Sequence, residues 1–152
     1  MRKVNDARAY HACYDSYRST LRRVALKDDF PAIDERLRAI LRRYVPPLVV
    51  AADGPGGYTL NVDRPDLPEP RRYFGGVRVG KRYVSYYLMP VYLFPELLDD
   101  ISPELKRRMQ GKSCFNFARL DEPLMTQLAD LTERGIQRFR QTGVAGVAVG
   151  KP

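Results

Sequence analysis

The sequence predicts a single domain of the α+β class, and three observations favour it. The length of 152 residues is that of one ordinary domain. Apolar residues recur at helical spacing in two segments, 28–47 and 121–139. Between them lie short runs of β-prone residues, of which 71–89 gives the clearest strand signal. There is no internal repeat and no second domain in this pattern.

The first helix is expected within 28–47. Asp28 or Asp29 can cap it, Pro31 suits its first turn, and Pro46-Pro47 ends it. One apolar face is formed by Phe30, Ile33, Leu37, Ile40, Leu41 and Tyr44. The basic residues Arg36, Arg38, Arg42 and Arg43 are expected away from that face.

Two pairs of strands are predicted next. "LVVAAD" and "YTLNVD" flank the glycine- and proline-rich stretch "GPGG", which is typical of a hairpin. The linker 64–70 is too rich in proline for regular structure. In the second pair, Gly80-Lys81 fits a two-residue type II′ turn that places Val79 opposite Arg82.

This register predicts a buried and a wetter face of the second pair, because side chains of a strand alternate. The buried face is expected to carry Tyr73, Val77, Val79, Val84, Tyr86 and Leu88. The wetter face is expected to carry Phe74, Arg78, Tyr83, Ser85 and Tyr87. The wetter set combines a cation with aromatic surface, as ligand grooves and protein interfaces do. The alternative is a half-exposed sheet face rich in tyrosine.

The C-terminal third contains three more predicted elements. Pro95 can start a short helical turn, and Ser102 caps a helix that ends at Gly111. A strand follows over 112–119, with Cys114 on the face opposite Phe115 and Phe117. Asp121 caps a last helix, whose apolar stripe is Leu124, Leu128, Leu131, Ile136 and Phe139.

The formal net charge of +8 is concentrated near the N-terminus, where residues 1–27 hold seven Lys or Arg and two Asp. Such a basic arm adds sequence-independent affinity for nucleic acid, and the alternative is a solvated extension. The sequence has no secretory signal and no membrane-spanning run, so we expect a cytoplasmic protein. In that compartment Cys13 and Cys114 are expected to be reduced.

Three motifs would each point to a specific chemistry, but the rest of the sequence does not support them. Gly111-Lys112-Ser113 resembles the end of a P-loop, but Lys106 stands where the first glycine belongs. Cys114 could serve a small thiol-dependent enzyme, yet the only histidine, His11, lies in the extension. His11 and Cys13 have no further soft ligands near them, so no metal site is expected. We therefore expect no catalytic residues and no cofactor.

The segments "YVSYYLMPVY" and "ISPELKRRMQGKSCFNF", with the acid-led final helix, resemble the YdhG-like family of small bacterial domains of unknown function. The resemblance covers roughly residues 28–140 and leaves a basic extension (1–27) and a Gly/Val/Ala-rich tail (141–152) outside it. It implies a curved antiparallel sheet of about five strands, with helices packed on one face and a groove on the other. Some relatives are labelled iron chaperones akin to frataxin, a role that needs a ridge of carboxylates. In this sequence the acids are scattered.

These expectations lead to one main hypothesis on function. It is a non-enzymatic binding domain with a small or peptide-like ligand, either anionic or neutral. The residues expected to bind this ligand are Phe74, Arg78, Tyr83, Ser85 and Tyr87. Alternatives are a thiol-dependent enzyme using Cys114, a frataxin-like iron-handling protein and a nucleic-acid accessory protein with a basic arm. The sequence indicates neither the oligomeric state nor the identity of a protein partner.

Overall fold

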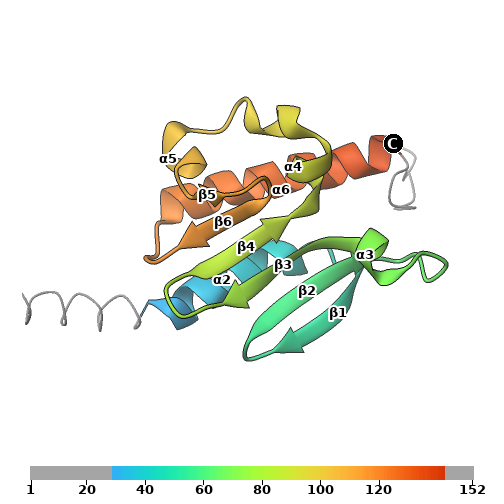
Figure 1. The fold of residues 1–152 in the computed structure, drawn as a ribbon, viewed down its shortest axis with the longest axis horizontal. Helices are drawn as coiled ribbons and strands as arrows, with labels where there is room; N and C mark the ends of the chain where they lie inside the picture. The colour runs from blue at the N-terminus through green and yellow to red at the C-terminus, as the bar shows by residue number, and fades with distance from the viewer. Residues whose placement is uncertain (1–28, 143–152) are drawn as a thin grey trace, which may run out of the picture.

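The fold is one antiparallel sheet with its long helices on a single face (Figure 1). A computed structural model describes residues 29–142. Six strands pair in the order β1-β2-β3-β4-β6-β5. In chain order the elements are α2 (Phe30–Arg42), β1 (Leu48–Gly54), β2 (Gly57–Val62), α3 (Glu69–Arg72), β3 (Tyr73–Val79), β4 (Val84–Leu88), α4 (Met89–Leu93), the 3-10 helix η1 (Pro95–Leu98), α5 (Pro103–Lys106), β5 (Met109–Gln110), β6 (Cys114–Phe117) and α6 (Glu122–Thr142).

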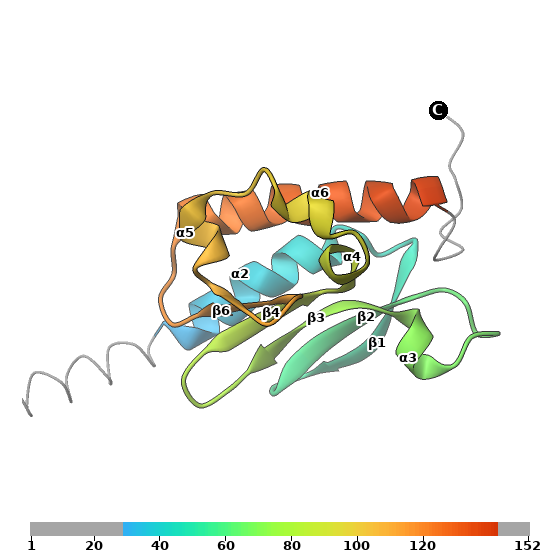
Figure 2. The same cartoon turned by 45° about the horizontal axis from the view of Figure 1, so that its top comes forward.

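The two long helices, α2 and α6, cover the same side of the sheet, and no long helix of residues 29–142 covers the opposite side (Figure 2). The core lies between these two helices and the sheet. There the apolar faces predicted for both helices are buried against the inward side chains of β2, β3, β4 and β6. Two edge-to-face ring pairs join Phe139 of α6 to Phe74 and Phe94. We call the uncovered side of the sheet the open face.

Most predicted elements are confirmed. The first helix occupies Phe30–Arg42 with Pro31 in its first turn, although Asp29 makes no side-chain capping bond. Asp121 does cap the last helix, since its Oδ1 accepts from the Leu124 amide at 3.2 Å. The hairpin of β1 and β2 is present, with Gly54 opposite Gly57.

Strand β3 differs from the prediction at two places, one in its register with β4 and one in its pairing with β2. Val79 lies opposite Val84 rather than Arg82, so the connection is a four-residue loop, 80–83. A shift of two residues leaves the alternation intact, and Val77, Val84 and Tyr86 are buried as expected.

The second difference exchanges two neighbouring side chains. On β2, Leu60 pairs with Gly75 but Asn61 pairs with Tyr73, so Phe74 is an extra residue in β3. Such a β-bulge reverses the alternation beyond it. Phe74 is therefore fully buried against Phe139, and Tyr73 moves to the open face. The prediction that Phe74 lies on the wetter face and Tyr73 in the core is wrong.

The helix predicted from Ser102 to Gly111 is much shorter than expected. Ser102 caps α5, with its Oγ accepting from the Leu105 amide at 3.1 Å, but the helix ends at Lys106. Met109 and Gln110 then form β5, which pairs with β6 at the edge of the sheet. Gly111 ends no helix; it occupies the turn between β5 and β6 with a φ of 74°.

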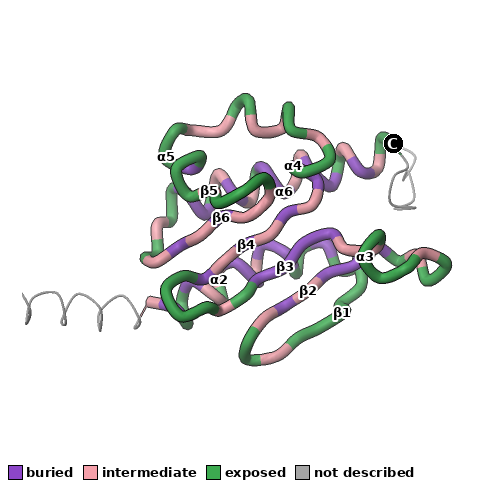
Figure 3. Tube along the Cα trace, viewed as in Figure 1, coloured by how far each residue is buried: buried purple, intermediate pink, exposed green. Residues whose placement is uncertain are grey.

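Exposure follows this architecture. In Figure 3 the purple, buried segments run through β3 and the inner sides of α2 and α6, whereas β1 at the sheet edge is almost entirely exposed. In the described part of the chain no helix is both long and apolar enough to cross a membrane. The basic extension and the Gly/Val/Ala-rich tail lie outside the described residues, apart from the last turn of α6.

Candidate binding face

The structure brings together part of the predicted site. Arg78 and Ser85 face each other across β3 and β4, and Tyr87 stands on the same open face. Tyr83 is in the β3–β4 loop rather than in a strand, and 40% of its surface is exposed. Phe74 does not belong to this face, for the reason given above, and Tyr73 takes its place.

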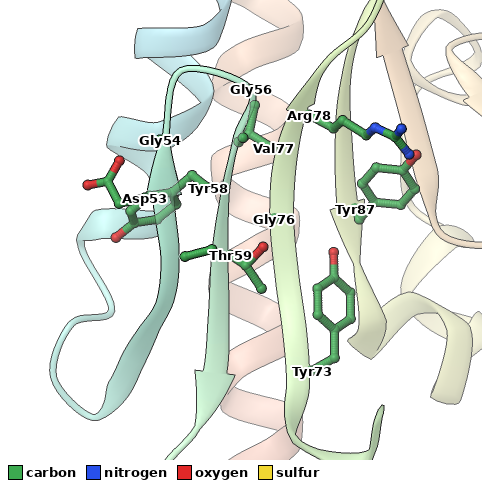
Figure 4. Close-up of a pocket in the computed structure, with 12 residues that line it drawn as sticks. Asp53, Gly54, Gly56, Tyr58, Thr59, Tyr73, Gly76, Val77, Arg78 and Tyr87 are labelled. Carbon is green, nitrogen blue, oxygen red and sulfur yellow. The ribbon is translucent and has the colours of Figure 1, made fainter. Parts of the chain in front are cut away.

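A hollow of about 450 Å³ lies at the centre of the open face (Figure 4). Its walls come from the β1–β2 hairpin on one side and from Tyr73, Arg78 and Tyr87 on the other. In Figure 4 the Tyr73 hydroxyl points towards Tyr87, and the Arg78 side chain extends towards the same ring. We call this space the central hollow.

The floor of the central hollow is bare backbone because of Gly76. This residue pairs with Thr59 on one side and Tyr87 on the other. A Cβ added to it would lie 2.6 Å from the Tyr58 carbonyl oxygen and 3.1 Å from the Tyr73 hydroxyl. No side chain fits there without moving a strand, so glycine creates the depth of the hollow.

Arg78 is the free cation of the central hollow. Its side chain is exposed, and no carboxylate of residues 29–142 lies within ion-pair distance of it. Burial raises the pKa of Tyr73, and it also raises the pKa of Tyr87, which the nearby guanidinium lowers in part. Both tyrosines are therefore neutral hydrogen-bonding groups at neutral pH, and Arg78 supplies the charge.

The opposite rim of the hollow is held in place by Arg38 of α2. Its guanidinium donates to Asp53 Oδ1 at 2.8 Å and to the Gly54 carbonyl at 2.7 Å, both near the tip of the hairpin. A third bond joins its Nε to Asp34 Oδ1 at 2.8 Å. Arg38 is 5% exposed, so the expectation that it lies away from the packed side of the helix is wrong. It pairs with Asp53, which is the one acid lining the hollow in the described part of the chain.

A row of polar side chains continues the open face towards β5. Asn116 accepts from Ser85 Oγ at 2.6 Å and donates to Gln110 Oε1 at 2.7 Å. A second hollow of about 220 Å³ lies over this row and is also lined by Tyr83 and Tyr87. These hydrogen bonds hold the side-chain amides of Asn116 and Gln110 in one orientation.

Cys114 lies beside this row, and its surroundings do not favour a nucleophile. Its thiol is 3.4 Å from Asn116 Oδ1 and is unpaired with any other cysteine of the described residues. Burial raises the pKa of the Cys114 thiol, although the neighbouring hydroxyls of Tyr87 and Ser85 lower it in part. A raised pKa reduces the thiolate, which is the reactive form. His11 and Cys13 lie outside the described residues.

Metal and nucleotide motifs find no support in this geometry. Between residues 29 and 142 no three His, Cys, Asp or Glu side chains cluster so as to hold a metal ion. Gly111-Lys112-Ser113 forms the turn between two strands. Gly75 and Gly80-Lys81 also have the glycine spacing of a P-loop, and they lie in β3 and the loop after it. Neither segment leads into a helix N-terminus, where phosphate-binding amides converge.

The residues that sequence patterns missed are Tyr73, Gly76, Gln110 and Asn116. Consecutive glycines within a strand, Gly75-Gly76, were the available signal, since they often mark a bulge or a close approach of backbones. Nothing in the local sequence around Gln110 and Asn116 indicated that their side-chain amides would lie on this face. No family model, no curated protein and no solved structure matches the chain, so membership of the YdhG-like family stays a prediction.

Proposed function

We propose that the protein is a non-catalytic binding domain whose open face takes a small or peptide-like anionic ligand. The observation that carries this proposal is the pairing of an unneutralised arginine, Arg78, with Tyr73 and Tyr87 around a floor of bare backbone. A planar group can lie against the tyrosine rings while a carboxylate or phosphate meets the guanidinium. We expect the domain to act in the cytoplasm and to belong to the YdhG-like family.

A binding role fits the open face better than catalysis does. The titratable groups that share this face with Arg78 include Tyr73, Tyr87 and Cys114, each with a pKa raised by burial. None of these is a general base poised near neutral pH. The frataxin-like alternative is less well supported, because the described residues contain no carboxylate cluster.

The proposal is tested by thermal-shift measurements on the full chain with a panel of aromatic carboxylates and aryl phosphates. At least one compound should stabilise the wild type and should have a much weaker effect on Arg78→Gln. The matched control is Arg140→Gln, which removes the same charge from α6 and should respond like the wild type. Equal responses of Arg78→Gln and the wild type to every active compound would show that the ligand lies elsewhere.

A further inference from the structure

The open face continues beyond the central hollow towards β5. The second hollow shares Tyr87 with the central one. A third, of about 390 Å³, shares Arg82, Tyr83, Gln110 and Asn116 with the second. The three hollows therefore form one track that crosses the sheet from β2 to β5. Neighbouring strands are about 4.8 Å apart, so the track is roughly 20 Å long.

The β5 end of this track is strongly basic. Lys81 and Arg82 line it from the β3–β4 loop, and Arg107 and Arg108 line it from the segment before β5. Among the described residues no carboxylate lines the second or third hollow. Within residues 29–142, Arg107 alone of the four has an acidic partner, Glu104 at 3.2 Å, and that pair is exposed. We call these four residues the basic end.

Aromatic side chains accompany the charge along the whole track. Tyr73 and Tyr87 line the central hollow, and Tyr83 stands between the second and third hollows with the Arg82 guanidinium 5.8 Å from its ring centre. A cationic groove with interleaved aromatic rings is the arrangement that binds unpaired bases and their phosphates together. The fixed amides of Gln110 and Asn116 offer hydrogen bonds to base edges.

We infer that this track binds a single-stranded nucleic acid, with phosphates against the basic end and bases against the tyrosines. The inference rests on the proposed function, because it assigns a ligand class to the same face. A small molecule would occupy one of the three hollows at a time. A chain instead sums several weak contacts along the track. Unpaired bases are required, since a duplex keeps its bases stacked on one another.

The test measures fluorescence anisotropy of a labelled single strand of about a dozen nucleotides, with the full chain at several salt concentrations. Arg82→Gln/Arg108→Gln should bind about tenfold more weakly and lower the slope of log affinity against log salt by about 1.4. Tyr87→Thr should also bind about tenfold more weakly with an unchanged slope, and Tyr87→Phe should bind like the wild type. The control Arg43→Gln/Arg140→Gln removes two charges from the helix layer and should bind within about twofold of the wild type.

Three outcomes would overturn the inference: no binding by the wild type, tighter binding of a duplex of equal length, or equal losses in the two double variants. The basic extension is present in every variant, so its contribution cancels in these comparisons. A parallel thermal-shift arm uses a mononucleotide. If the mononucleotide stabilises the wild type but not Arg78→Gln while the single strand binds no better, the inference fails and the proposed function stands. If neither a nucleic acid nor any small anion stabilises the wild type more than Arg78→Gln, both the inference and the proposed function fail.

Discussion

The exchange of Tyr73 and Phe74 by the β-bulge makes a prediction that separates the structure from simple strand alternation. The Phe74 ring is fully buried and contacts Phe139 edge-to-face at 5.4 Å between ring centres. Truncating such a side chain costs about 3–5 kcal/mol in the free energy of unfolding, from lost burial and the cavity left behind. Tyr73 stands on the open face above Gly76, so Tyr73→Ala should cost about 1 kcal/mol.

Urea unfolding followed by circular dichroism measures both costs. With a slope of about 2 kcal/mol per M, Phe74→Ala should lower the midpoint by roughly 2 M and Tyr73→Ala by roughly 0.5 M. If Phe74→Ala is too unstable to measure, Phe74→Leu should still lose about 1 kcal/mol. A larger loss of stability in Tyr73→Ala than in Phe74→Ala would contradict the β-bulge, because Tyr73 would then be the core residue.

Three further predictions concern charge and protonation. Arg38→Ala should cost about 1–3 kcal/mol in urea unfolding, because it removes three hydrogen bonds made by a buried guanidinium, whereas Arg36→Ala, which breaks an exposed pair, should cost about 0–1 kcal/mol. Equal costs would contradict the rim contact. Burial raises the pKa values of Tyr44 and Tyr86 above the ordinary value of 10.0, so the folded state holds more protons than the unfolded one at alkaline pH. The free energy of unfolding should therefore fall as the pH rises above about 10, and flat stability there would be the contrary result. With the other cysteine replaced by serine, Cys114 should react with iodoacetamide more slowly in the folded than in the unfolded protein; faster reaction would revive the thiol enzyme.

The sequence predicted correctly those features that depend only on residues close together in the chain. The caps at Ser102 and Asp121 and the apolar stripes of the two long helices are properties of neighbouring residues, and they are confirmed. The alternation of β4 survived a wrong turn length, because an error of two residues does not change which face a side chain takes.

The errors have causes that lie far away in the chain. Phe74 is buried because β2 pairs around it, and α5 ends early because Met109 and Gln110 pair with β6. Arg38 is buried because its partner Asp53 folds back onto α2 from 15 residues further along. These are tertiary interactions, which override local propensity. For the same reason Tyr73 could not be grouped with Arg78 and Tyr87 before the bulge was known.

The central claim is that the ligand lies on the open face, and chemical-shift mapping of the ¹⁵N-labelled protein tests it most directly. An aryl phosphate or single strand that stabilises the protein would be titrated in. We expect the largest shifts on the amides of Gly76, Arg78 and Tyr87 and of their neighbours in β2 and β4. Shifts confined to the outer surfaces of α2 and α6, with those amides unchanged, would contradict the central claim.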